Sequence, residues 1–197
     1  MPIPPEIAIA TRNAHKVGEI RAICAAWPTT WRTADDGWPD VAETGRTYLD
    51  NARLKAHAIA AATGVPALAD DSGIEVDALG GAPGPRSARY AGDDASDAEN
   101  LAALLDAVRG VPGLGRTARY RCVVVLAMPD GAEVSAEGVC EGTLATRPRG
   151  EGGFGYDPAF VPAGWDVTLA ELAPGEKDRI SHRGRALRAL RATLEAS

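Results

Sequence analysis

The 197-residue sequence predicts an α/β fold in which one domain, residues 1–197, is built on a mixed β-sheet. Short apolar segments typical of buried strands alternate with longer segments in which apolar residues recur at helical spacing. Two long strand-like segments, 118–128 and 133–146, flank Pro129-Asp130-Gly131, a sequence typical of a hairpin turn. Strands mixed with helices, together with one antiparallel hairpin, indicate a mixed sheet. The chain contains no internal repeat, low-complexity tract or interdomain linker.

The N-terminal part of the chain predicts one strand and two helices. Residues 7–10 form a short apolar run, as expected for a buried strand. A helix follows from about Ala14 and ends before Pro28, because proline cannot continue a helix. After a polar connection, a second helix is expected over residues 48–63, where Gly64 ends it.

The remaining elements follow from apolar runs and helix caps. Residues 65–69 predict a buried strand that ends at two carboxylates, and a long glycine- and proline-rich loop, 80–85, comes after it. The segment 96–99 is a capping box, and Ser181 is expected to cap the last helix. Each of these two helices carries an apolar stripe, formed by Leu101, Leu104, Leu105 and Val108 in the first and by Ala186, Leu187, Leu190 and Leu194 in the second.

Composition describes an ordinary globular protein and excludes several classes. Hydrophobic residues make up 45% of the chain and charged residues 24%. The net charge of −6 argues against a broad electrostatic grip on DNA or RNA. Three cysteines without metal-ligand spacing indicate free thiols in a reducing compartment. With no signal peptide and no apolar stretch of membrane-spanning length, we expect a cytoplasmic protein that is not bound to a membrane.

The first segment that carries chemistry is Thr11-Arg12-Asn13-Ala14-His15-Lys16. Asn13 stands where a helix N-cap belongs, and Lys16 falls in the first turn, where a cation is locally unfavourable. A bound anion would reverse that sign, so a hydroxyl, backbone N–H groups and a lysine after a buried strand predict a phosphate cradle. An ordinary capped helix with a surface lysine is the alternative interpretation.

The second segment, Asp70-Asp71-Ser72, places two adjacent carboxylates at a predicted strand end. Adjacent side chains on a strand point to opposite faces, so one carboxylate is expected to serve the local backbone and the other to do chemistry. A carboxylate here could hold a divalent cation or accept a proton from water. Glu43 is a candidate second metal ligand, although the neighbouring acids Asp35, Asp36 and Asp40 are equally available. The alternative is a turn that closes the strand.

Two further segments suggest recognition of a ligand. In the segment 150–158, four glycines surround Phe154, one of two phenylalanines in the chain, which favours a base-stacking platform over a core position. In the segment 176–184, Lys177, His182 and Arg183 crowd the entrance of the last helix, where they could donate to carbonyl or phosphate oxygens. A tight turn with a buried ring and a solvated charged face are the alternatives. Together the four segments point to a nucleoside triphosphate and Mg²⁺.

These segments resemble the inosine/xanthosine triphosphate pyrophosphatase family, whose members remove non-standard purine nucleotides. The resemblance runs from residue 11 to residue 184, in the same order along the chain. The residues that carry it are Thr11-x-Asn13-x-x-Lys16, Glu43-Thr44-Gly45, Ala69-Asp70-Asp71-Ser72-Gly73-Ile74-Glu75-Val76, Gly80-Gly81-Ala82-Pro83-Gly84 with Ser87-Ala88-Arg89-Tyr90, Gly152-Gly153-Phe154-Gly155-Tyr156-Asp157-Pro158, and Glu176-Lys177 with Ile180-Ser181-His182-Arg183-Gly184.

The resemblance implies a homodimer of elongated α/β subunits, each with a long mixed sheet, two lobes and a central substrate cleft. It implies Mg²⁺-dependent hydrolysis of ITP, dITP and XTP to the monophosphate and pyrophosphate, with no nucleic-acid partner. Asp71 would be the proton acceptor and a metal ligand, and Glu43 would assist the metal. The substrate-binding residues would be Thr11, Arg12, Asn13, Ala14, His15, Lys16, Ser72 and Lys177 for the phosphates, Phe154, Gly155, Tyr156 and Asp157 around the base, and His182 and Arg183 at its 6-keto edge.

The chain departs from the family pattern at two places. Arg12 stands where many relatives have glycine, and Pro85-Arg86 replaces an apolar-aromatic pair. Neither position coincides with a proposed acid or base. Three other functions compete: an aspartyl-phosphate phosphatase, a pyrophosphatase for modified pyrimidine nucleotides, and a nucleotide sensor without turnover.

Overall fold

The computed structural model describes residues 2–34 and 37–196, and it confirms the predicted α/β class with a mixed sheet. The six strands lie in the order β2-β1-β3-β4-β5-β6. β1 is parallel to both β2 and β3, whereas β5 and β6 are antiparallel. The strands are β1 (Glu6–Ile9), β2 (Thr30–Thr33), β3 (Ala67–Val76), β4 (Thr117–Ala127), β5 (Glu133–Leu144) and β6 (Phe160–Pro162), and the helices are α1 (Ala14–Ile23), α2 (Tyr48–Thr63), α3 (Asp97–Ala107), α4 (Pro174–Ile180) and α5 (His182–Ala196).

The described residues fall into two compact units, and each has its own core. The first unit takes its residues from 1–71, 122–138 and 182–197, and the second from 72–121 and 139–181. Strands β3, β4 and β5 each contribute residues to both units.

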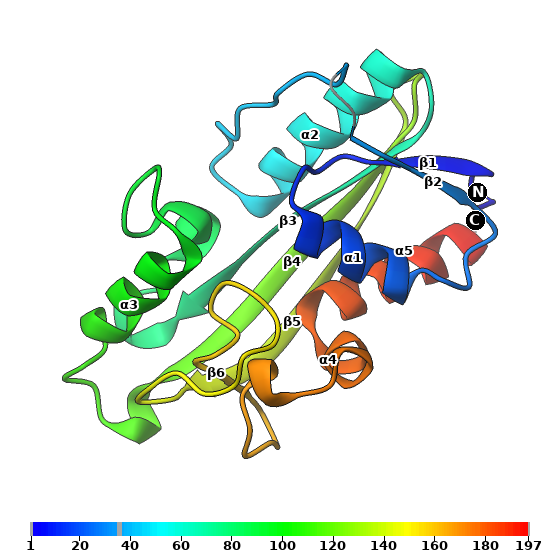
Figure 1. Ribbon diagram of the computed structural model, residues 1–197. Helices are drawn as coiled ribbons and strands as arrows, with labels where there is room; N and C mark the ends of the chain where they lie inside the picture. The colour runs from blue at the N-terminus through cyan, green and yellow to red at the C-terminus, as the bar shows by residue number, and fades with distance from the viewer. Residues whose placement is uncertain (1, 35–36, 197) are drawn as a thin grey trace. The chain divides into compact units, whose positions relative to one another are not determined.

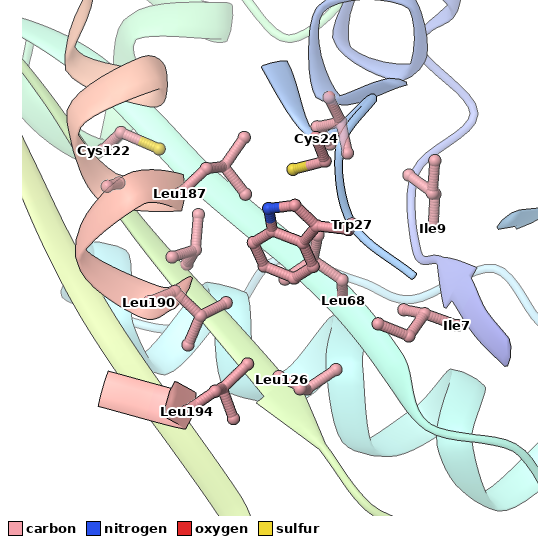
Figure 2. Close-up of a cluster of buried hydrophobic side chains, with 13 residues drawn as sticks. Ile7, Ile9, Cys24, Trp27, Leu68, Cys122, Leu126, Leu187, Leu190 and Leu194 are labelled. Carbon is pink, nitrogen blue, oxygen red and sulfur yellow. The ribbon is translucent and has the colours of Figure 1, made fainter. Parts of the chain in front are cut away.

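In the first unit, helices cover both faces of the sheet (Figure 1). On one face, α1 and α5 pack against each other and against the alternating side chains of the strands. Figure 2 shows this cluster, in which Leu187, Leu190 and Leu194 of α5 lie beside Trp27 and Leu68. On the other face, small residues of α2 such as Ala52 and Ala56 pack on the alanines of β1 and β3. Residues 67–69 of β3 therefore alternate between the two cores, as the period of a strand requires.

In the second unit, α3 and β6 pack on the inner side chains of β3, β4 and β5. The apolar stripe predicted for α3 contributes Leu101, Leu104 and Val108 to this core. The Ser96–Glu99 capping box is present at the start of α3, as predicted. Short 3-10 helices complete the structure, at Asp77–Leu79, Gly84–Arg89, Gly113–Gly115 and Leu169–Glu171.

Several predicted elements are confirmed, and one expectation is wrong. The second helix spans the predicted residues 48–63 with Gly64 in the left-handed conformation, and the hairpin turn lies between β4 and β5. The three cysteines are free and buried. However, β3 does not end at the two carboxylates but continues to Val76. The structure also contains the strand β2, which the sequence did not predict, before the polar connection to α2; Trp31 of β2 packs against the core.

Candidate active site

The two adjacent carboxylates of strand β3, Asp70 and Asp71, point to opposite faces of the sheet. Asp70 follows the face of Leu68 and contacts Lys16 of α1 and Arg183 of α5. Asp71 follows the face of Ala69 and contacts α2. The alternation predicted from the sequence is therefore confirmed, although it arises within a continuous strand and not at a strand end.

Asp70 is the centre of a buried ion-pair cluster. Arg183 donates to Asp70 Oδ2 from Nη2 (2.8 Å) and Nε (3.2 Å), and Lys16 Nζ lies 3.2 Å from the same oxygen. Burial opposes ionisation, but the charges of Arg183, Lys16 and Lys55 outweigh it and hold the pKa of Asp70 well below its usual range. Asp70 is thus an anionic anchor, and a group held in this way is a poor proton acceptor at neutral pH.

Arg183 is almost fully buried, with 1% of its surface exposed. Besides Asp70 it pairs through Nη1 with Glu19 of α1. Burial alone would lower the pKa of this guanidinium, but Asp70 and Glu19 raise it, so the charge is permanent. The two ion pairs fix the guanidinium plane at the start of α5.

Asp71 lies in a different environment, on the face covered by α2. Asn51 Nδ2 donates to Asp71 Oδ2 (3.1 Å), and Lys55 Nζ lies 3.6 Å from Oδ1. Lys55 also donates to Glu43 Oε1 at 2.6 Å, so one ammonium lies between two carboxylates. Burial is the main cause of a raised pKa at Asp71; Lys55 opposes it, and the charge of Glu43 adds to it.

Lys55 is itself charged despite its burial. Loss of hydration would lower its pKa, but the carboxylates of Asp70, Asp71 and Glu43 raise it above the ordinary value. Its position shows that the space between Glu43 and Asp71 accommodates a cation. Two carboxylates at such a place fit Mg²⁺, which is commonly held by one or two carboxylates together with substrate phosphates.

No group of three or more His, Cys, Asp or Glu side chains that could hold a metal by itself occurs within residues 2–34 and 37–196. A Mg²⁺ ion at Glu43 and Asp71 would take its remaining ligands from water or from phosphate oxygens. Two of the alternative acids, Asp35 and Asp36, lie outside the described residues. The third, Asp40, pairs with Arg12 (3.1 Å).

The predicted phosphate segment forms the entry to α1. Asn13 is the N-cap, and its Oδ1 accepts from the backbone N–H groups of His15 (2.9 Å) and Lys16 (3.2 Å), while Thr11 Oγ1 accepts from Asn13 N. The side chain of Lys16 turns inward to Asp70. Ala14 and His15 are exposed in the first turn of the helix.

The departure from the family pattern at Arg12 has a structural partner. Its Nη2 donates to the carbonyl of Trp38 at 2.7 Å, and its Nε contacts Asp40. The guanidinium thus ties the start of α1 to residues 38–40. At the other departure, Pro85 and Arg86 lie in the 3-10 helix Gly84–Arg89.

The second unit holds the predicted aromatic loop. Asp157 is buried and accepts at Oδ2 from Lys177 Nζ (2.6 Å) and from the backbone N–H of Phe154 (2.9 Å). Lys177 Nζ also lies 5.0 Å from the centroid of the Phe154 ring, which is within cation–π range. Gly153 has φ +70°, and a Cβ at this position would lie 2.1 Å from Asp157 Oδ2, so the motif requires glycine here.

Two contacts anchor the loop to the rest of this unit. Tyr156 is a core residue whose hydroxyl donates to the carbonyl of Ser87 (2.7 Å). The backbone N–H of Gly155 donates to Asp97 Oδ2 (2.9 Å) at the start of α3. Phe154 itself is only half-buried, which leaves part of its ring surface accessible.

The structure places the other predicted residues as follows. Ser72 is half-buried in β3, in the second unit, next in sequence to Asp71. His182 is buried at the first position of α5, in the first unit. Within the first unit, Asp70, Lys16 and Arg183 come together on one face, and Glu43 and Asp71 come together on the other. Within the second unit, Phe154, Asp157 and Lys177 come together.

Sequence reasoning missed three residues of these clusters, namely Glu19, Asn51 and Lys55. Asn51 and Lys55 stand one turn apart on the buried face of α2, beside Ala52 and Ala56. Polar residues on the buried face of a helix are uncommon unless they are paired, and this signal was available in the sequence. For Glu19, no comparable signal exists in the sequence.

Comparison with known proteins adds an independent line of evidence. The Ham1 family model matches residues 7–193. A dITP/XTP pyrophosphatase of Geobacillus kaustophilus is 51% identical over 184 residues, which are 92% of this chain and 90% of the relative. One of Streptomyces coelicolor is 51% identical over 188 residues, which are 93% of this chain and 94% of the relative.

Solved structures agree with the sequence matches. A HAM1 protein from Coxiella burnetii superimposes with a TM-score of 0.88 at 41% identity and covers 98% of this chain and 100% of its own. The Staphylococcus aureus Ham1 protein gives a TM-score of 0.82 at 38% identity and covers 97% of this chain and 98% of its own.

In residues 2–34 and 37–196, none of the helices has the length and apolar character needed to cross a membrane.

Proposed function

Because the chain belongs to the Ham1 family, we propose that it hydrolyses non-standard purine nucleoside triphosphates to the nucleoside monophosphate and pyrophosphate. The family resemblance inferred from the motifs is confirmed. Relatives about half identical over more than nine-tenths of the chain carry the name dITP/XTP pyrophosphatase, which supports ITP, dITP and XTP as substrates. The proposal includes the homodimer and the cytoplasmic location expected from the sequence.

The observation that carries the proposal is the environment of Asp71. Its carboxylate is buried, its pKa is raised, and its two oxygens face Asn51 and Lys55. A carboxylate with a raised pKa is a stronger base than an exposed one and is suited to accept a proton from an attacking water. Asp70, with its lowered pKa, is not suited to this role. We therefore assign the proton acceptor to Asp71.

Glu43 and Asp71 are the residues that would hold Mg²⁺, with phosphate oxygens of the substrate completing its ligands. When bound, the ion would neutralise negative charge on the phosphates as the anhydride bond breaks. The two carboxylates that support this assignment both face the Lys55 ammonium, so they lie close to one another. Lys55 opposes the rise in the pKa of Asp71 that burial and the charge of Glu43 cause.

We assign the phosphates to the entry of α1, from Thr11 to Lys16, together with Ser72 and Lys177. Lys16 supports this role because its ammonium lies at Asp70 and not in bulk solvent, so it is held near the strand that carries Asp71. Lys177 contacts the Phe154 ring and Asp157, so its charge also stabilises the aromatic loop.

We assign the base to Phe154, Gly155, Tyr156 and Asp157, and its 6-keto edge to His182 and Arg183. The ion pairs that fix Arg183 support this assignment, because a rigid N–H group can donate to the keto oxygen of the base, whereas the amino group of adenine is itself a donor and would stay unpaired. A site that hydrogen-bonds one substituent rejects an analogue that lacks it by a large factor.

Substitution Asp71→Asn tests the central assignment. The amide keeps the size and hydrogen-bonding ability of the side chain but cannot accept the proton, so we expect kcat for ITP to fall about 100-fold or more. Binding of a non-hydrolysable ITP analogue, measured by calorimetry, is expected to stay close to that of the wild type. A variant with near wild-type kcat would remove Asp71 from the mechanism.

A further inference from the structure

Asn51 bridges two segments that carry proposed catalytic groups. Its Oδ1 accepts from the backbone N–H of Gly45 (2.8 Å), and its Nδ2 donates to Asp71 Oδ2 (3.1 Å). The side chain is buried, with 1% of the residue exposed, and it stands in the second turn of α2. One amide group thus connects the loop that follows Glu43 to the proposed proton acceptor.

The loop approaches Asn51 so closely that only glycine fits at position 45. A Cβ at Gly45 would lie 2.5 Å from Asp50 Cβ, 2.6 Å from Asn51 Oδ1 and 2.9 Å from Asn51 N. The last of these is a backbone atom inside α2 and cannot move away cheaply. The Glu43-Thr44-Gly45 segment is therefore fitted to the Asn51 amide.

Side chains of α2 approach both carboxylate oxygens of Asp71. Asn51 contacts Oδ2, and Lys55, one turn later on the same face, lies 3.6 Å from Oδ1. Lys55 also binds Glu43. Two groups that approach different oxygens of one carboxylate restrict its rotation about the Cβ–Cγ bond, because any rotation lengthens at least one contact.

We propose that Asn51 is a positioning residue that fixes the orientation of the Asp71 carboxylate and its distance from the Glu43 loop. It touches Asp71 and the loop backbone and acts on the substrate only through them. The inference rests on the proposed function, because it takes Asp71 as the proton acceptor. A donor held on Oδ2 leaves Oδ1 as the oxygen that acts toward Lys55, Glu43 and the substrate.

Two substitutions distinguish the contact of Asn51 with Gly45 from its contact with Asp71. Asn51→Asp keeps an oxygen that accepts from Gly45 N but, as a carboxylate, has no donor for Asp71. Asn51→Ala removes both contacts. We expect kcat for ITP to fall about 10–100-fold in both variants, the usual effect of losing an outer partner of a site residue, while KM changes little.

Amide hydrogen exchange of the nucleotide-free protein gives a readout that does not depend on activity. We expect the Gly45 amide to exchange faster in Asn51→Ala and to remain protected in Asn51→Asp. The matched control is Asn100→Ala, because Asn100 is equally buried and bridges backbone groups of Ala88 and Ala91 to α3. This control is expected to lower the melting temperature with little change in kcat.

The outcomes are distinguishable. An Asn51→Asp variant with wild-type kcat would overturn the proposal, as would losses of kcat in Asn51→Ala and Asn100→Ala that follow their losses of stability equally. A wild-type protein that turns over no nucleotide would overturn the proposed function. In that case only the hydrogen-exchange measurements test whether Asn51 holds the Gly45 amide. Equal exchange rates of the Gly45 amide in the wild type and all variants would refute that contact.

Discussion

Asp70 and Asp71 are chemically identical neighbours, yet the pKa of the first is lowered and that of the second is raised. The difference arises because adjacent side chains of a strand point to opposite faces. Asp70 therefore contacts the cations Lys16 of α1 and Arg183 of α5, whereas Asp71 accepts a hydrogen bond from Asn51 of α2. A single strand therefore supplies an anchor on one face and a candidate base on the other.

The lowered pKa of Asp70 predicts how the free energy of unfolding changes at acid pH. Because the folded-state pKa of Asp70 lies below its unfolded value of about 3.9, its stabilising contribution is complete above that pH and is lost as the pH falls below it. We expect the free energy of unfolding, from urea titrations at several pH values, to fall less steeply below about pH 4 in Asp70→Asn than in the wild type. Equal slopes in the two proteins would show that Asp70 is not ionised more readily in the folded state.

The aromatic loop makes a prediction about binding. Substitution Phe154→Ala removes the half-buried ring and its contact with Lys177, so we expect KM to rise several-fold for all purine substrates alike. Phe154→Leu serves as a control that keeps apolar volume but removes the stacking face. A KM unchanged in the alanine variant would place the ring outside the substrate site.

Some contacts of individual residues could be predicted from the sequence, and others could not. The cap at Asn13 follows from a short motif. The polar residues on the buried face of α2 indicate that Asn51 and Lys55 are paired. Their carboxylate partners, like the Arg183 partner of Glu19, lie 12 or more residues away, and only the fold brings them together. Pairing of this kind depends on packing, which a local pattern does not encode.

At the scale of elements, strong local signals gave the most accurate predictions. Helix α2 and the hairpin of β4 and β5 have long periodic segments and clear end signals, and both are present. Strand β2, strand β6 and helix α4 are short, and their residues carry no extended periodicity, so only tertiary pairing establishes them. The continuation of β3 through two buried carboxylates depends likewise on partners that the sequence does not show.

The contact between β5 and α5 makes a prediction about packing. A Cβ at Gly138 would lie 2.2 Å from the carbonyl oxygen of His182 and 2.3 Å from the backbone nitrogen of Ala186. We therefore expect Gly138→Ala to destabilise the protein by about 1–3 kcal/mol or more in chemical denaturation. The control is Gly18→Ala in α1, where no atom lies within 4 Å of the new Cβ, and it should stabilise the protein by about 0.5–1 kcal/mol. Equal effects of the two substitutions would contradict the close approach at Gly138.

At the scale of the whole molecule, one sheet supplies strands to two units with separate cores. The first unit contributes the carboxylates and most of the cations, whereas the second contributes the aromatic loop with Asp157 and Lys177. Each unit therefore carries its own cluster of paired charges.

The most direct test of the central claim is the identity of the products. Purified protein would be incubated with ITP, XTP, GTP, ATP and dUTP, with and without Mg²⁺, and pyrophosphate would be separated from orthophosphate. We predict pyrophosphate and the monophosphate from ITP and XTP, dependent on Mg²⁺ and nearly absent with ATP and GTP. Orthophosphate as the sole inorganic product, or equal turnover of ATP, would contradict the account.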